Sequence, residues 1–174
     1  MKRVVVIGLG IFGFNIAKDL YESGFEVIAI DKNKDNIQKI KDFSTKAILA
    51  DGADKEVIES IGIQPDDVAI IPFGEDLAAS TLITLHLKEM KVKTIIVKAP
   101  NEDHKHVLEK VGATEVVIPE RAMADKVAKA WFPQTSLIIS LFLRIIRSVR
   151  WRLPPVLWER RSERSTLGAN TILR

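Results

Sequence analysis

The chain has 174 residues, no cysteine and a formal net charge of +3. Its length suits one domain of ordinary size, and the lack of cysteine excludes disulfides, thiolate metal sites and a cysteine nucleophile. The charge is unevenly placed, with a net charge of −3 on residues 1–130 and +6 on residues 131–174, so the main domain is not expected to bind nucleic acid.

The first predicted element is a strand over residues 4–7, four consecutive aliphatic residues followed by a glycine-rich turn. Such a run is typical of a strand buried on both faces, and a helix is predicted behind it as far as Gly24. In this G-x-G-x-x-G pattern, Gly8 permits a tight turn, Gly10 lets the backbone approach a pyrophosphate, and Gly13 lets the helix pack closely on the strand. The N–H groups at the start of that helix attract an anion. The motif therefore predicts a phosphate site.

The next predicted strand, residues 26–31, ends on an acid 18 residues after Gly13. A carboxylate in this place accepts hydrogen bonds from the ribose hydroxyls of an adenosine nucleotide and disfavours a 2′-phosphate. The alternative is that Asp31 only caps the helix that follows. We interpret the two strands, the glycine turn, the helix and the terminal acid together as a nucleotide-binding unit.

The rest of the domain alternates short aliphatic strands with helices. Further strands are predicted at residues 46–51, 67–73, 93–98 and 115–118, and further helices at residues 37–43, 54–62, 77–90, 101–112 and 121–130. Parallel strands need crossover connections, and right-handed crossovers cover both faces of a sheet with helices. The sequence therefore predicts an α/β fold with a doubly wound, parallel, six-stranded, Rossmann-like sheet.

Ligands of such sheets bind at the carboxyl ends of the strands, so the residues that follow each strand are the candidates. Asp51 is either an acceptor for the adenine amino group or only a turn residue before Gly52. Lys98 is predicted to place a cation beside the phosphate site, with a solvated lysine as the alternative. From position alone, Glu120 is interpreted as a cap of the last helix rather than a metal ligand. His104, near the rim of the pocket, is interpreted as structural or solvated.

The residues offer little for catalysis. A dehydrogenase needs a proton-transfer group placed against its substrate, and usually more chain than the nucleotide fold itself. The single tyrosine, Tyr21, lies on the first predicted helix, and no Ser-His-Asp arrangement is visible in the sequence. We therefore expect a protein that binds a nucleotide without being an enzyme, with a small NAD-dependent oxidoreductase as the alternative.

Several stretches of residues 1–130 match a known family pattern: VIGLGIFG at 6–13, AID at 29–31, AASTL at 78–82, VKA at 97–99, HKHVLEKVGA at 104–113 and IPER at 118–121. On these stretches the domain resembles the KTN family, also called the N-terminal domain of RCK or TrkA-type proteins, which regulate potassium channels and transporters. The last two stretches are far more specific than the glycine motif. Within the family, the chain is most similar to the cytoplasmic gating-ring subunits of Ktr-type potassium uptake systems.

This resemblance implies a nucleotide-sensing regulatory subunit of a potassium uptake transporter or channel. The implied partners are an integral-membrane potassium transporter or channel subunit and further copies of the chain, as a dimer and a larger ring. The implied location is cytoplasmic, at the inner face of the cell membrane, and the residues before the first strand lack the apolar segment of a signal peptide.

The resemblance also implies a ligand and its contacts. The ligand is an adenine nucleotide, namely NAD(H), ADP, AMP or ATP. For Glu120, interpreted above as a helix cap, the resemblance instead implies a contact with Mg²⁺ or another divalent cation near the phosphates. The implied nucleotide contacts are Gly8, Gly10, Ile11, Phe12, Gly13, Asp31, Lys32, Asn33, Asp51, Gly52, Phe73, Gly74, Glu75, Lys98, Ala99, Pro100 and His104.

One position departs from the family pattern. ATP-responsive members have an arginine between the second glycine of the motif and the phenylalanine, where this chain has Ile11. An arginine there reaches a γ-phosphate across the dimer. Its replacement by isoleucine weakens the case for ATP and favours ADP, AMP or NAD(H).

Residues 131–174 form a tail rich in Arg and Trp, in place of the second, smaller ligand-binding domain with which family members continue. Its apolar run at residues 137–143 is far shorter than the ~20 residues that span a bilayer. We interpret the tail as the product of a frameshift near Ala130, because a reading frame shifted one base upstream permits a sequence similar to the family's continuation. A basic amphipathic helix that lies on a membrane surface is the alternative.

Overall fold

The computed structural model describes residues 2–131. The chain divides into one compact unit of residues 1–122 and a second of residues 123–174, of which residues 123–131 are described. The tail that we interpret as a frameshift product lies outside the described residues except for Trp131. In the part of the chain that the structure describes, no helix is both long enough and apolar enough to cross a bilayer.

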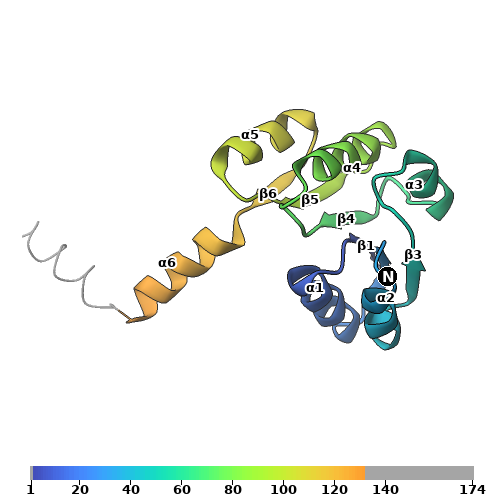
Figure 1. The fold of residues 1–174 in the computed structure, drawn as a ribbon, viewed down its shortest axis with the longest axis horizontal. Coiled ribbons are helices and arrows are strands. Elements are labelled where there is room, and N and C mark those ends of the chain that lie inside the picture. The colour runs from blue at the N-terminus through green and yellow to red at the C-terminus, as the bar shows by residue number, and fades with distance from the viewer. Residues whose placement is uncertain (1, 132–174) are drawn as a thin grey trace, which may run out of the picture. The chain divides into compact units, whose positions relative to one another are not determined.

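Strands and helices alternate along the described chain, as predicted (Figure 1). The strands are β1 (Arg3–Ile7), β2 (Glu26–Asp31), β3 (Lys46–Leu49), β4 (Val68–Ile71), β5 (Thr94–Lys98) and β6 (Glu115–Val117). The helices are α1 (Ile11–Glu22), α2 (Lys34–Ile40) with the 3₁₀ turn η1 (Lys41–Phe43), α3 (Lys55–Ile61), α4 (Leu77–Glu89), α5 (Glu102–Val111) and α6 (Pro119–Trp131).

All six strands pair in parallel, in the order β3-β2-β1-β4-β5-β6. The chain starts in the middle of the sheet, moves outward to β3, and then returns past β1 to β4 and outward to β6. The direction of winding therefore reverses between β1 and β4. This confirms the predicted doubly wound sheet, and a reversal of this kind is the place where ligands of such sheets bind.

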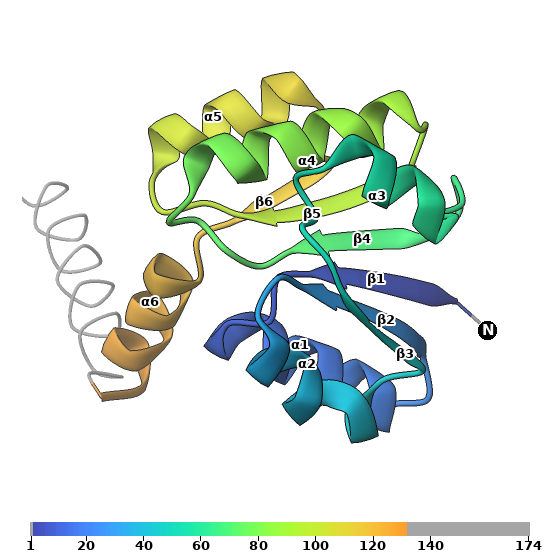
Figure 2. The same cartoon turned by 45° about the vertical axis from the view of Figure 1, so that its right-hand side comes forward.

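The sheet is buried on both faces, which is why its strands are almost wholly aliphatic. Val4 and Val6 of β1 pack in the core under α1 and α2, whereas Val5 and Ile7 pack in the core under α3, α4 and α5 (Figure 2). All four side chains are buried, and burial of one such side chain contributes about 1.5–3 kcal/mol. The alternation along β1 thus joins two cores into one domain.

Several boundaries differ from the prediction by a few residues, and three of them bear on the site. β4 ends at Ile71 rather than residue 73, because Pro72 has no N–H to continue the ladder. β3 ends at Leu49, so Asp51 lies in the turn after the strand. α6 begins at Pro119 rather than residue 121, because proline suits the first position of a helix.

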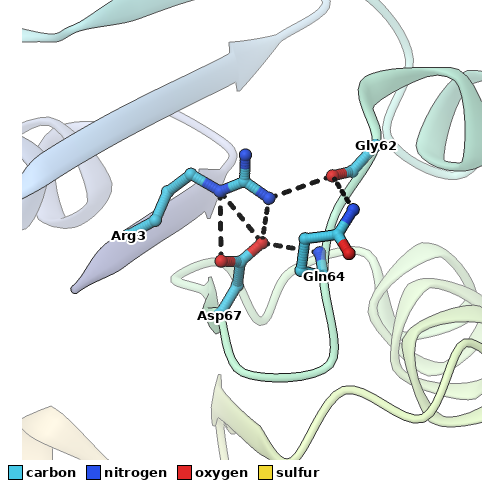
Figure 3. A network of polar contacts seen from close by, with 4 residues as sticks. All are labelled: Arg3, Gly62, Gln64 and Asp67. Carbon is cyan, nitrogen blue, oxygen red and sulfur yellow. Dashed lines mark hydrogen bonds and ion pairs between the residues drawn. The ribbon is translucent and has the colours of Figure 1, made fainter. Parts of the chain in front are cut away.

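A polar network lies at the amino ends of the strands, opposite the edge where the carboxyl ends lie (Figure 3). The guanidinium of Arg3, at the start of β1, donates to both carboxylate oxygens of the buried Asp67, at 2.5–3.0 Å. The backbone N–H of Gln64 donates to the same carboxylate at 2.6 Å, and Arg3 also donates to the carbonyl of Gly62 at 3.0 Å. The network satisfies a buried charge and joins β1 to the loop before β4, so we assign it to stability rather than ligand binding.

Candidate functional site

The glycine turn after β1 has the geometry that its sequence predicts. Gly8 adopts φ of +105°, which few other residues tolerate. A Cβ on Gly13 would lie 2.1 Å from the carbonyl oxygen of Gly8 and 2.6 Å from Cγ of Pro72, so α1 packs directly on the turn. A Cβ on Gly10 would meet nothing within 4 Å. The space beside Gly10 is therefore open.

The start of α1 differs from the starts of the next four helices. Each of α2 to α5 is capped by an Asn or Asp side chain that accepts from a backbone N–H of its first turn. The N-cap position of α1 is Gly10, and among the described residues this helix has no side-chain cap and no acid in its first turn. The first N–H groups of a helix have no acceptor within the helix. They carry partial positive charge at this end of α1, and this makes it suitable for an anion.

A cavity of about 240 Å³ lies at the carboxyl ends of β1, β2 and β3, beside the glycine turn. Eight of the residues singled out from the sequence line it: Gly8, Gly10, Asp31, Lys32, Asp51, Gly52, Phe73 and Glu75. The other residues expected to contact a nucleotide lie outside its lining: Ile11, Phe12, Gly13, Asn33, Gly74, Lys98, Ala99, Pro100 and His104. The structure therefore brings together the part of the predicted site that follows β1, β2, β3 and β4.

Sequence reasoning missed the apolar wall of this cavity and one of its acids. The additional lining residues are the apolar Ile7, Leu9, Ile30, Ala50, Ala79 and Ile83 and the acid Asp76. Three of them directly precede residues singled out from the sequence: Ile7, Ile30 and Ala50. Their position at the end of a predicted strand was therefore the feature that indicates them. Ala79 and Ile83 lie one turn apart on α4, and their spacing alone does not distinguish a cavity wall from an ordinary core face.

Asp31 is tied to the glycine turn by its own carboxylate. Its Oδ2 accepts from the N–H of Leu9 at 2.5 Å and from Nδ2 of Asn36 at 3.2 Å, and its Oδ1 accepts from the N–H of Asn33 at 2.7 Å. The cap of α2 is Asn33, so the capping alternative for Asp31 is wrong. A carboxylate has about four acceptor positions, so Asp31 can hold the turn in place and still accept from a ligand.

Asp51 makes the contact expected of a turn residue, which was one of its two interpretations. Its Oδ1 accepts from the N–H of Ala53 at 2.9 Å, two residues ahead, and this contact tightens the turn. A contact with an adenine amino group stays a prediction. Gly52 has a packing role that the sequence did not reveal, since a Cβ there would lie 2.3 Å from Cγ2 of Ile7.

Lys98, at the end of β5, connects α1 to α6. Its Nζ lies 2.6 Å from Oε1 of Glu120 and 5.8 Å from the ring centroid of Phe12, the second residue of α1. The Lys98 side chain is 22% exposed, so the solvated alternative does not describe it. Its hydrogen bond lowers the pKa of the Glu120 carboxyl, which keeps that group ionised.

The described residues do not by themselves fit a divalent-cation site at Glu120. Within residues 2–131 there is no group of three or more His, Cys, Asp or Glu side chains that could hold a metal ion. The carboxylate of Glu120 is paired with an ammonium, which a cation would have to displace. Divalent hard cations in proteins are held by several oxygen ligands. We therefore derive no role through a metal at this position.

His104 is a buried side chain of α5, 7% exposed, and neither ring nitrogen has a hydrogen-bond partner among the described residues. Its backbone N–H donates to Oδ1 of Asn101, the cap of α5, at 2.8 Å. The structural interpretation of His104 agrees with this burial, and its contact with a nucleotide stays a prediction. His106 on the same helix is exposed.

Burial lowers the pKa of His104, because its charged form loses contact with water. The unfolded chain then binds a proton more readily, near the ordinary pKa of about 6.5. We expect the contribution of His104 to stability to be complete above pH 6.5 and to fall by at most about 1.4 kcal/mol per pH unit below it. Urea unfolding at pH 7.5 and 5.5 measures this loss.

The matched comparison for this pH effect is between two histidines of one helix. His104→Leu should lose less free energy of unfolding than wild type between pH 7.5 and 5.5, whereas His106→Gln should behave as wild type. Equal losses in all three proteins would assign the pH dependence to other groups.

The sequence is similar to those of known proteins. Residues 4–119 match the profile of the TrkA-N domain family. Ktr system potassium uptake protein C of Bacillus subtilis is 43% identical over 127 residues, which are 73% of this chain and 58% of that protein. Ktr system potassium uptake protein A of the same organism is 40% identical over 129 residues, which are 74% of this chain and 58% of that protein. The chain thus spans 58% of the length of each of these relatives.

A solved structure is also similar. The NAD(P)-binding domain of an exopolyphosphatase-related protein from Archaeoglobus fulgidus superposes with a TM-score of 0.61 at 26% sequence identity. The similarity covers 78% of this chain and 98% of that domain.

Proposed function

The chain belongs to the TrkA-N domain family, and from this membership we propose that it is a nucleotide-binding regulatory subunit of a potassium uptake transporter or channel. Two relatives in this family are named as Ktr system potassium uptake proteins. They are similar to this chain over 127 and 129 residues, and the match to the family at residues 4–119 includes every residue that lines the cavity. The proposal assigns nucleotide binding to that part.

The start of α1 and the carboxylate of Asp31 both border the cavity. The start of α1 has no side-chain cap among the described residues, which suits an anion, and Asp31 lines the cavity beside it. The carboxylate of Asp31 is hydrogen-bonded to the glycine turn, at the N–H of Leu9. A nucleotide has the matching chemistry, because its phosphates suit the helix start and its ribose hydroxyls suit a carboxylate. The similar domain from Archaeoglobus fulgidus, described as NAD(P)-binding, supports the same class of ligand.

We propose an adenine nucleotide as the ligand: ADP, AMP, NAD(H) or ATP. The cavity is lined by the acids Asp31, Asp51, Glu75 and Asp76 and by Lys32 as its lysine, so an additional phosphate on the ribose would be repelled there. Ile11, the first residue of α1, is 89% exposed and supplies no cation for a γ-phosphate. These features favour NADH over NADPH, and ADP, AMP or NAD(H) over ATP.

The proposed mechanism is regulatory rather than catalytic. Among the described residues, the cavity is lined by carboxylates, a lysine and apolar side chains, and Tyr21 lies outside its lining. A ligand with different affinities for two shapes of an assembly shifts the population toward one of them. We propose that this shift acts on an integral-membrane potassium transporter or channel subunit at the inner face of the cell membrane.

We also propose that the chain assembles with itself, as a dimer and a larger ring. Met123, Val127 and Trp131 recur every four residues along α6 and are 59%, 48% and 78% exposed. Residues at this spacing share one face of a helix. An exposed apolar face supports association with a second copy, which analytical ultracentrifugation of the full chain tests.

Isothermal titration calorimetry of the full 174-residue chain tests nucleotide binding. The ligands are AMP, ADP, ATP, NAD⁺, NADH and NADPH, each with EDTA and then with Mg²⁺. We expect binding of at least one adenine nucleotide and weaker binding of NADPH than of NADH. Absence of binding by any of them to folded protein would contradict the proposal, and turnover of NADH with a simple carbonyl substrate would favour the oxidoreductase alternative.

A further inference from the structure

The ammonium of Lys98 is already occupied in this structure by a carboxylate of the same chain. Nζ of Lys98 lies 2.6 Å from Oε1 of Glu120, at the length of a charge-assisted hydrogen bond. The lysine is the less accessible partner, with 22% of its side chain exposed against 64% for Glu120. Glu120 is therefore the partner that can move away into water at lower cost.

The same ammonium lies close to the start of α1. It stands 5.8 Å from the ring of Phe12, whose residue belongs to the uncapped first turn that attracts an anion. A lysine is a flexible point charge with three donors. A phosphate held at the start of α1 would therefore compete with Glu120 for Lys98.

We propose that Glu120 is a specificity-determining residue that competes with ligand phosphates for the ammonium of Lys98. This inference rests on the proposed nucleotide binding at the glycine turn. With the pair closed, Lys98 contributes little net positive charge to the site. Only a ligand whose phosphates outcompete one carboxylate opens the pair, so Glu120 lowers the affinity for anionic ligands.

Opening of the pair also has a structural consequence. Glu120 belongs to the first turn of α6, and its partner Lys98 ends β5. When a phosphate takes over Lys98, the first turn of α6 loses its ion pair with the sheet. The neighbouring ion pair of that turn, between Arg121 and Glu102 of α5, does not involve Lys98 and remains. The negative charge of the ligand thus controls one of the two ion pairs that the described residues form at the first turn of α6, the pair between Lys98 and Glu120.

The test compares two carboxylate-to-amide variants of equal charge change in the full chain. Glu120→Gln removes the competitor of the phosphate, whereas Glu102→Gln breaks the neighbouring ion pair and leaves Lys98–Glu120 intact. ADP affinity is measured by calorimetry in EDTA at low ionic strength. We expect Glu120→Gln to bind ADP ~2–5-fold more tightly than wild type, the range of an exposed ion pair. Glu102→Gln should stay within about 1.5-fold, because Lys98 keeps its partner Glu120 and the guanidinium that is freed, that of Arg121, is 68% exposed and screened by solvent.

A Lys98→Gln background separates competition from a general loss of negative charge. If Glu120 acts through Lys98, Glu120→Gln no longer improves ADP affinity when Lys98 is also Gln, as a double-mutant cycle reports. Two results would overturn this inference and leave the proposed function intact. One is a gain in ADP affinity from Glu120→Gln that persists without Lys98, and the other is no gain from Glu120→Gln while wild type binds ADP. If no variant, Glu120→Gln included, binds ADP, this inference is overturned. If wild type also binds none of the other five nucleotides, the proposed function is overturned with it.

Discussion

Replacement of Gly13 by alanine should lower the free energy of unfolding by about 2 kcal/mol. The new Cβ would lie 2.1 Å from the carbonyl oxygen of Gly8 and 2.6 Å from Pro72. A backbone oxygen cannot rotate away as a flexible side chain can, so α1 must shift from β1, and overpacking of this kind costs about 1–3 kcal/mol or more. The better helix propensity of alanine returns only about 1 kcal/mol. Urea unfolding of the full chain measures the difference.

Gly10→Ala is the matched control for Gly13→Ala. Its Cβ enters open space, and φ of −60° suits alanine, so stability should change by less than about 1 kcal/mol. ADP affinity should nevertheless fall, because the methyl group occupies the side from which a pyrophosphate approaches the turn. A Gly13→Ala protein as stable as wild type would show that α1 does not pack on the turn as described.

Asp31→Asn should weaken the binding of ADP by about 10–100-fold. A hydrogen bond to a charged group is worth about 1.5–3 kcal/mol, and an amide offers one acceptor oxygen where the carboxylate offers two. That oxygen must serve the N–H groups of Leu9 and Asn33, which Asp31 now satisfies with separate atoms. Little acceptor capacity remains for ribose hydroxyls. Calorimetric titration with ADP measures the loss.

Asp35→Asn is the control for this substitution. Asp35 is exposed in the first turn of α2, four residues from Asp31, and the change in charge is the same. We expect ADP affinity within about twofold of wild type, since an exposed charge outside the cavity is screened. Equal effects of the two substitutions would show that net charge, and not the position of Asp31, controls binding.

Most of the fold follows from local patterns. β1 and β2 are continuous aliphatic runs, and their burial on both faces requires helices on both sides. The glycine motif fixes the start of α1, because Gly8 needs a positive φ and Gly13 needs close packing. The end of β3 was less predictable, since it depends on where pairing stops rather than on the residue pattern, whereas the end of β4 follows from Pro72.

The candidate site was predictable where it follows strand ends and was not where it depends on distant pairs. Asp31 and Asp51 follow directly from the parallel topology. The bond from Leu9 to Asp31 and the pair between Lys98 and Glu120 join residues about 20 positions apart. No periodicity encodes such contacts, because they depend on how two elements meet in space. The apolar wall on α4 likewise has the pattern of an ordinary core helix.

Hydrogen–deuterium exchange of the full chain with and without saturating ADP tests whether the nucleotide binds at the glycine turn, because exchange protection reports where a ligand orders or covers the backbone. We expect slower exchange in peptides that cover residues 8–13 and 31–33, at the glycine turn and after β2. Exchange at the amino-terminal edge of the sheet, around residues 62–67, should be unchanged. Unchanged exchange at residues 8–13, in protein that binds ADP, would show that the nucleotide binds elsewhere and would contradict the proposed site.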